Sequence, residues 1–136
     1  MTVQLREATR HAMLDQIESL NGTSVSMRIY TGAQPGDVTQ ANSGTILADL
    51  NPPTDWMNAA SGGTKTKLGT WQDASADNPG TPGHFRMYNS QATKDGTTCF
   101  MQGSCAVGSG DINFDGTITA GQQVTINTFV LTAGNP

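Results

Sequence analysis

The sequence predicts a mainly β protein, an antiparallel β-sandwich or barrel preceded by one N-terminal α-helix. Three observations predict this class. The apolar residues follow a helical period only at the start of the chain, and after Gly22 the period changes to two, as in half-buried strands. Short candidate strands then recur, separated by turn residues. Only 13% of the residues are charged, against roughly a quarter in typical domains, which favours short strands and tight turns.

The chain has 136 residues, a length that predicts a single domain, with the helix in residues 1–22 and the β-sandwich in residues 23–136. At this size folding buries roughly two-thirds of the surface of the unfolded chain. A stable core is therefore expected without metals or disulfides.

Residues 3–20 carry the helical pattern. One half of the helical wheel is apolar and comprises Leu5, Ala8, Ala12, Met13, Ile17 and Leu20. The other half comprises Glu7, Arg10, His11 and Glu18. Thr2 is a candidate N-cap, and Asn21-Gly22 supplies a left-handed stop. The apolar half is expected either to dock on the sheet or to contact another subunit.

Seven segments read as strands: 24–30, 45–50, 65–71, 85–88, 97–107, 111–114 and 122–131. The residues expected to face the core are Val25, Met27, Ile29, Phe85, Met87, Val124 and Ile126. Gly103 is a candidate bulge in the fifth strand. A second bulge near Asn127-Thr128 would explain the shift in buried phase along the last strand.

Two cysteines are too few for a disulfide framework. A hairpin that turned at Gln102 would bring Cys99 and Cys105 together. If the segment is one strand instead, their even separation puts both on one face, roughly 20 Å apart and beyond disulfide reach. We favour the strand, which predicts two free thiols.

The charge pattern argues against nucleic acid as a partner. The formal net charge is −4, and the seven basic residues are scattered, with none after Lys94; phosphate binding requires clustered Lys and Arg. No apolar run approaches the roughly 20 residues needed to cross a bilayer, so no membrane span is expected. The first residues also lack a secretory pattern, and the protein is expected to function without being secreted.

The segment 111–118 matches the first eight positions of a calcium-binding loop, with Asp111, Asn113, Asp115 and Gly116 in register. Position twelve is Gln122, whose amide cannot supply the closing bidentate carboxylate. The favoured interpretation is a turn that joins two strands, and no metal is expected.

Catalytic and cofactor motifs are also missing from the sequence. Neither His11 nor His84 has a metal-ligating neighbour at ligand spacing. No nucleophile elbow, P-loop or dinucleotide fingerprint is present, and Ser61-Gly62-Gly63 reads as ordinary loop sequence. We therefore expect no catalytic residues, no bound cofactor and no enzymatic activity.

The aromatic residues allow two interpretations. Trp56 and Trp71, with Tyr30 and Tyr88 on the outward faces of their strands, could stack on sugars. Alternatively, both tryptophans anchor loops to the core. We favour the second interpretation.

The order of segments resembles a family of small structural proteins of tailed bacteriophages, of the capsid decoration (cement) type. The resemblance rests on the helix, on 27–32 with Pro35, and on 45–50. It continues through Gly80-Thr81, Phe85-Arg86-Met87, Asp95-Gly96-Thr97, Gly103, 111–114, Ile118, Gly121, Val124, Ile126, Phe129, Leu131 and Thr132. This sequence differs from the family pattern in the Pro/Gly loop 78–83 and in the two cysteines. These are strand and turn signatures, so the resemblance transfers no functional residue.

The resemblance implies a protein that binds the major capsid protein and stabilises the virion. It would lie on the capsid surface, assemble in the host cytoplasm, and form a homo-oligomer, either a dimer or a trimer. The helix or the loops 51–64 and 73–83 would make the contacts. An alternative is a tail or head-fibre surface protein that binds host carbohydrate.

Overall fold

The computed structural model describes residues 3–134. Within them the chain forms α1 (Glu7–Asn21), β1 (Ser26–Tyr30), β2 (Ile46–Leu50), β3 (Thr64–Thr66), β4 (Trp71–Asp73), β5 (His84–Tyr88), β6 (Cys99–Val107), β7 (Ile112–Phe114), β8 (Val124–Ile126) and β9 (Val130–Thr132). Strands hold 34% of the residues and helix 11%. The mainly β class with one N-terminal helix is confirmed.

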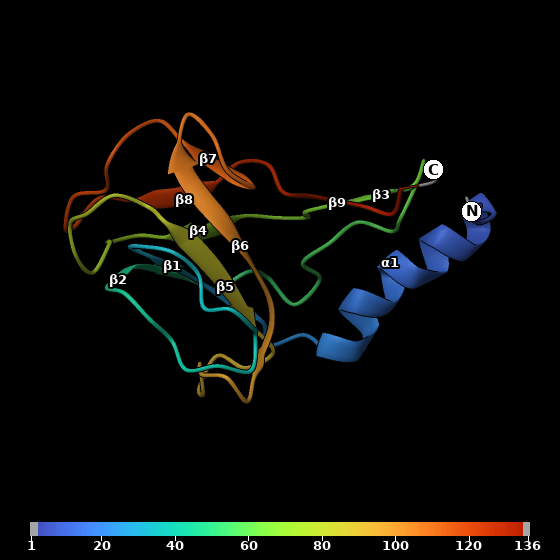
Figure 1. The fold of residues 1–136 in the computed structure, drawn as a ribbon, viewed down its shortest axis with the longest axis horizontal. Helices are drawn as coiled ribbons and strands as arrows, with labels where there is room; N and C mark the ends of the chain where they lie inside the picture. The colour runs from blue at the N-terminus through green and yellow to red at the C-terminus, as the bar shows by residue number, and fades with distance from the viewer. Residues whose placement is uncertain (1–2, 135–136) are drawn as a thin grey trace.

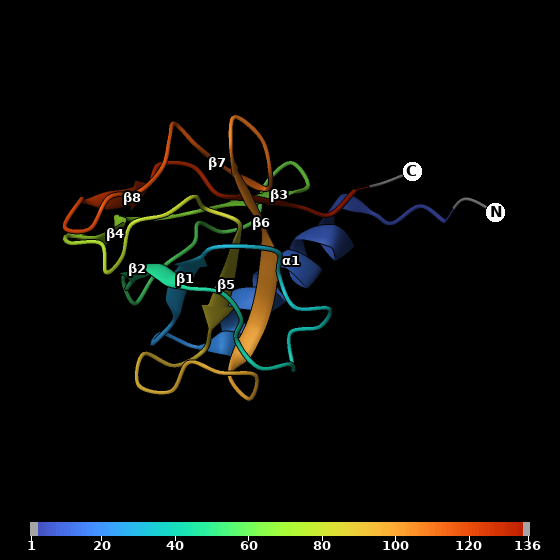
Figure 2. The same cartoon turned by 60° about the vertical axis from the view of Figure 1, so that its left-hand side comes forward.

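The strands form one five-stranded sheet in the order β2-β1-β5-β6-β7 and two ribbons, β3-β9 and β4-β8. The sheets curl into a half-barrel, consistent with the predicted sandwich or barrel (Figure 1). The ribbon β4-β8 lies beside β2 in both views (Figures 1 and 2). All pairings are antiparallel except that of β6 with β7, which is parallel.

The core lies inside this curl. All the residues predicted to face the core are buried there: Val25, Met27, Ile29, Phe85, Met87, Val124 and Ile126. They alternate along β1, β5 and β8 because successive side chains of a strand point to opposite faces of the sheet. The period-two prediction is therefore confirmed.

β5 is buried on both faces, which the sequence pattern did not predict. His84, Arg86 and Tyr88 lie on the outer face, opposite the core, and each has no exposed surface. The segment 31–45 covers them. Gly83 permits this close approach, because a Cβ there would lie 2.1 Å from the carbonyl oxygen of Gly32. Tyr30 and Tyr88 thus lie on the outer face as predicted but are not solvent-exposed.

The helix and the ribbon β3-β9 project from the half-barrel and form an arm; the rest of the domain is called the body (Figure 1). α1 begins at Glu7 rather than at residue 3, with Arg6 in extended conformation as its N-cap (φ −58°, ψ 145°). The proposed cap Thr2 lies outside the described residues. At the other end Gly22 has φ 75° and donates its backbone N–H to the Glu18 carbonyl, so the predicted stop is confirmed.

Two predicted strands are each divided in the structure. The segment 65–71 becomes β3 and β4, separated by Gly69 with φ 72°. The segment 122–131 becomes β8 and β9, which pair with β4 and β3 respectively. The buried phase does shift at Asn127-Thr128, but the cause is a change of partner strand rather than a bulge.

Both cysteines lie on β6 and are free, as predicted. They do not share a face. The β5-β6 register shifts between Met87 and Tyr88, because Phe100 is an extra residue in β6. Cys99 consequently faces outward opposite Tyr88, while Cys105 joins the core. The bulge was predicted at Gly103, which instead pairs regularly with Phe85.

Candidate interaction surface

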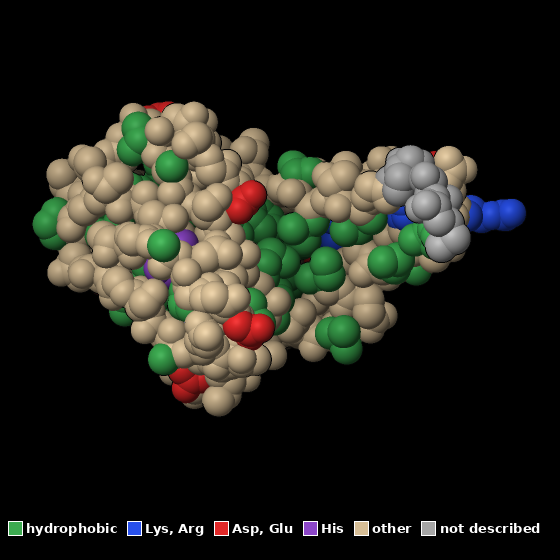
Figure 3. All heavy atoms as spheres, viewed as in Figure 1, with side chains coloured by type: hydrophobic (Ala, Val, Ile, Leu, Met, Phe, Trp, Pro, Cys, Tyr) green, Lys and Arg blue, Asp and Glu red, His purple; other side chains and the backbone are tan. Residues whose placement is uncertain are grey.

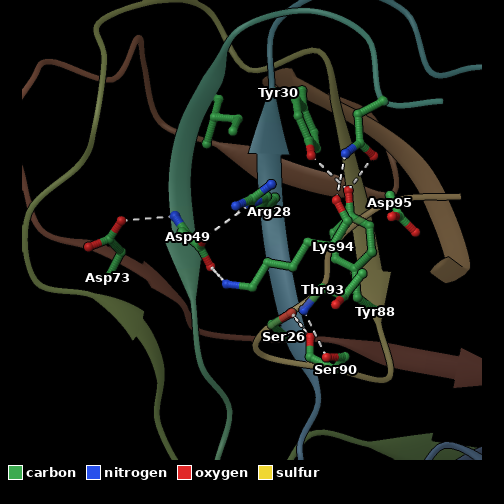
Figure 4. Close-up of polar contacts among 12 residues, drawn as sticks. Ser26, Arg28, Tyr30, Asp49, Asp73, Tyr88, Ser90, Thr93, Lys94 and Asp95 are labelled. Atoms are coloured by element: carbon green, nitrogen blue, oxygen red, sulfur yellow. Dashed lines mark hydrogen bonds and ion pairs between the residues drawn. The ribbon is translucent and has the colours of Figure 1, made fainter. Parts of the chain in front are cut away.

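A layer of polar side chains crosses the outer face of β1, β2 and β5 (Figure 4). The Asp49 carboxylate accepts hydrogen bonds from Arg28 Nε at 2.9 Å and from Lys94 Nζ at 2.5 Å. The Asp49 backbone N–H donates to the Asp73 carboxylate at 2.9 Å. These contacts join β1, β2, β4 and the loop that carries Lys94. Their charges neutralise one another within the layer.

The second half of the layer holds the segment 31–45. Tyr30 and Tyr88 share a hydroxyl hydrogen bond of 2.7 Å, and the Tyr88 hydroxyl donates to Asn42 Oδ1. Arg86 donates to the same oxygen at 2.8 Å and to the Val38 carbonyl at 2.6 Å. Burial raises the pKa of the Tyr88 hydroxyl. These polar groups have a structural role, since their partners belong to the covering segment itself.

The two histidine side chains also form hydrogen bonds with backbone groups. His84 Nδ1 lies 2.9 Å from the Gly32 carbonyl, its ring stacks on Tyr30, and burial lowers its pKa, which favours the neutral ring. His11 Nε2 accepts the Gly63 backbone N–H at 3.0 Å. Within residues 3–134, no three His, Cys, Asp or Glu side chains gather as a metal site would require.

The calcium-like segment is partly strand rather than loop, because 112–114 forms β7. At about 3.3 Å per residue, an extended chain places Asp111 and Asp115 roughly 13 Å apart, too far to share one ion. The Asp111 carboxylate instead accepts the backbone N–H and the hydroxyl of Ser104, at 2.9 and 3.0 Å. It ties β7 to β6.

Both tryptophans are fully buried in the core. Trp56 donates its indole N–H to the Gly22 carbonyl, and Trp71 donates to the Leu68 carbonyl. The interpretation that they anchor loops to the core is therefore confirmed. A sugar ring cannot stack on either residue in this fold.

α1 docks on the ribbon β3-β9 through the side that carries the buried Leu14 together with charged residues. Lys65 of β3, only 3% exposed, donates to the Asp15 carboxylate at 2.7 Å and to the Asn58 carbonyl at 2.9 Å. Arg10 donates to the Ala133 carbonyl at 3.0 Å. The Lys65 hydrogen bond lowers the pKa of Asp15, while burial raises that of Glu18, which lies 3.7 Å from the same ammonium. Polar contacts thus fix the rotation of the helix.

The opposite side of α1 faces solvent and is termed the outward face. Its residues are Ala8, Thr9, Ala12, Met13, Gln16, Ser19 and Leu20, and none carries a charge. Met13 is 55% and Leu20 73% exposed. The expectation that the apolar half docks on the sheet is wrong, since of its predicted members only Ile17 packs against the core. The charged side of α1 docks instead, because its ion-pair and hydrogen-bond partners lie in β3 and the segments next to it.

A hollow of about 280 Å³ separates the arm from the body. Its apolar lining comes from Phe85, Met101, Phe129, Val130 and Leu131, and its polar lining comes from Gln102 and Asp111. Apolar side chains gather in the region between arm and body (Figure 3). β6 does not close this side, because it pairs with β7 only over residues 105–107.

The loops 51–64 and 73–83 offer less apolar surface than α1. Trp56 and Met57 in the first loop, and Ala76 and Pro82 in the second, turn inward and are buried. Of the three elements expected to contact a partner, α1 alone exposes large apolar side chains among the described residues.

No protein-family model matches the chain, and no curated protein matches it. The likeness to phage structural proteins therefore rests on the sequence motifs given above. In the described part of the chain, α1 is too short and too polar to cross a membrane.

Proposed function

We propose that this protein is a capsid decoration protein of a tailed bacteriophage: a non-enzymatic module that binds the major capsid protein and reinforces the shell. It acts on the virion surface after assembly in the host cytoplasm. The proposal joins the sequence resemblance, which runs from the helix to Thr132, to the surface that the fold presents.

One observation carries the proposal: the outward face of α1 is uncharged and exposes Met13 and Leu20, while buried polar contacts hold the helix in that orientation. A soluble monomer gains nothing from this arrangement, because exposed apolar area is unfavourable in water. A protein whose task is to bind other subunits does gain, because the face becomes buried on assembly.

The energetics suit a repeating lattice. Each 100 Å² of apolar surface removed from water contributes about 2.5 kcal/mol before the entropy of association is subtracted. A modest contact is therefore weak in isolation. Repeated at every equivalent position of a symmetric shell, it becomes a substantial reinforcement.

The polar chemistry of the fold is consistent with this role. The charged groups of the outer layer are occupied in holding 31–45 and the loop that carries Lys94. Both histidines bond to backbone. These charged groups and both histidines are thus engaged in structural contacts.

A binding assay with assembled shells tests the proposal. Purified protein is mixed with shells that lack it and is sedimented, beside the variant Leu20→Glu and a control, Ala120→Glu, which changes an exposed residue in the turn before β8. The wild type and the control should co-sediment with the shells. Leu20→Glu should bind more weakly, because it places a charge on the outward face.

Failure of the wild-type protein to bind shells would contradict the proposal. A glycan-binding screen on the same sample separates the two classes of function. Specific sugar binding without shell binding would favour a fibre protein, although through residues other than Trp56 and Trp71, which are buried.

A further inference from the structure

The segment 31–45, termed the strap, is held on the outer face of the sheet by hydrogen bonds rather than by apolar packing. It contains no helix or strand, none of its residues is buried, and none belongs to the hydrophobic core. Its backbone carbonyls and the Asn42 side chain accept hydrogen bonds from four side chains of the outer face: His84, Arg86, Tyr88 and Gln102. A segment attached in this way can open while the core stays folded.

The bond from His84 to the strap defines the tautomer of the ring. His84 Nδ1 lies 2.9 Å from the Gly32 carbonyl oxygen. Because a carbonyl oxygen only accepts hydrogen bonds, the neutral ring carries its proton on Nδ1 and leaves Nε2 unprotonated. Nε2 is buried and has no hydrogen-bond partner among the described residues, and His84 as a whole has no exposed surface.

A second proton on this ring is unfavourable while the strap is closed. It would turn Nε2 into a buried donor without an acceptor. The ring stacks on the neutral Tyr30 of β1, at 5.0 Å between ring centroids, and shares the outer face of β5 with the Arg86 guanidinium. Across the sheet it pairs with Ser104 of β6, which already occupies the Asp111 carboxylate. Burial lowers the pKa of His84, and the positive charge of Arg86 acts in the same direction.

From this geometry we infer that His84 is a pH-sensitive switch: proton uptake by its ring in mild acid opens the strap and uncovers Tyr30, Arg86 and Tyr88. In the open state the ring reaches water and regains its ordinary pKa of 6.5. The open state therefore binds a proton that the closed state excludes, and opening becomes more favourable as the pH falls below 6.5. The inference goes beyond capsid decoration and does not depend on it.

The size of the effect follows from this difference in proton binding. An open state with a pKa of 6.5 makes opening up to about 30-fold more favourable at pH 5.0 than at pH 7.5, if the closed state takes up no proton over that range. Asp37, the one titratable residue of the strap, does not contribute. Hydrogen bonds from the backbone N–H and the hydroxyl of Thr39 lower its pKa from 3.8, so it stays charged throughout.

Hydrogen exchange of the full chain at these two pH values tests the switch. NMR follows the Thr31 and Gln40 backbone N–H groups, which donate to carbonyls within the strap. Protection factors are compared, because they remove the intrinsic pH dependence of exchange. His84→Asn retains an N–H donor near the position of Nδ1 but cannot become charged. The control His11→Gln removes the other histidine and retains an acceptor for the Gly63 N–H.

The strap protection factors of the wild type and the control should fall by up to about 30-fold at pH 5.0, while those of β1 and β5 stay the same. In His84→Asn the strap should be equally protected at both pH values. His84→Gln, also uncharged, replaces this variant if His84→Asn does not fold, as circular dichroism verifies. A fall of the same size in the uncharged variant would overturn the inference. So would an equal loss of protection in strap and core strands, or a ring that titrates near pH 6.5 while the strap stays protected.

Discussion

The ammonium of Lys65 lies 2.7 Å from the carboxylate of Asp15, and this contact, together with the buried Leu14, determines which side of α1 faces β3. Lys65 is 3% exposed and Asp15 43%. The amine is thus buried at the base of the arm, while the carboxylate reaches it from the edge of the helix. An apolar face that would otherwise be expected to dock remains outward as a result.

Asp15→Ala should lower the free energy of unfolding by about 1–3 kcal/mol, because it leaves the buried Lys65 ammonium without its nearest carboxylate and the Ala60 N–H without an acceptor. Gln16→Ala is the matched control, one residue away on the outward face, and should change stability by less than about 0.5 kcal/mol. Urea denaturation followed by circular dichroism measures both. Equal effects of the two variants would show that the contact does not stabilise the fold.

The same pair predicts a dependence on pH. The pKa of Asp15 is lowered in the folded state, so the ion pair stabilises the fold above the ordinary value of 3.8, and this stabilisation is lost as the pH falls through the lower folded value. The stability difference between the wild type and Asp15→Asn should shrink toward zero on acidification.

The Glu18 carboxyl should show the opposite dependence. Burial raises its pKa, so Glu18→Gln should have a higher free energy of unfolding than the wild type at neutral pH. Parallel pH profiles for the two variants would contradict this account.

Gly103 is required for packing rather than for a bulge. A Cβ there would lie 2.5 Å from a ring carbon of Phe85 and 2.9 Å from the Asp111 carboxylate. Gly103→Ala should therefore destabilise the protein by about 1–3 kcal/mol. Gly116→Ala is the control, since nothing lies within 4 Å of its Cβ position. A melting temperature for Gly103→Ala equal to that of the control would mean that β6 can shift away from Phe85.

The period of the apolar residues was sufficient to predict β1 and the residues expected to face the core, but not the division of 65–71 and 122–131 into separate strands. Met27 and Ile29 alternate with polar neighbours, and a half-buried strand can satisfy that pattern in only one way. The burial of Arg86 could not be predicted similarly, because it depends on the carbonyl of Val38, in a segment 48 residues away. Local pattern describes one face of a strand and carries no information on what covers the other.

The helix illustrates the same limit. The wheel placed Ile17 in the apolar half, but Ile17 lies on the docked side with the charged residues, and that side is held by Lys65, a residue of β3. Likewise, the extra residue Phe100 moved Cys99 to the outer face of the sheet, opposite Tyr88. Bulges and long-range ion pairs are set by tertiary contacts, which periodicity does not encode.

The cysteines give a chemical prediction. Burial raises the pKa of Cys105 to about 12 and also raises that of Cys99, so both thiols are protonated and inaccessible in the native protein. A thiol reagent at neutral pH should modify the native protein slowly and should find two thiols after denaturation without reductant. A count of zero in the denatured sample would mean that Cys99 and Cys105 are bonded, as a hairpin would allow.

The heat stability of complete virions tests the central claim most directly. Particles with and without the protein are heated through a series of temperatures, also at reduced ionic strength, and the DNA that escapes is measured with a dye that cannot enter intact shells. Decoration predicts that particles without the protein release DNA at a lower temperature. Adding back the purified protein should restore the original release temperature, and adding Leu20→Glu should not. Equal release temperatures for complete and depleted particles would contradict the account.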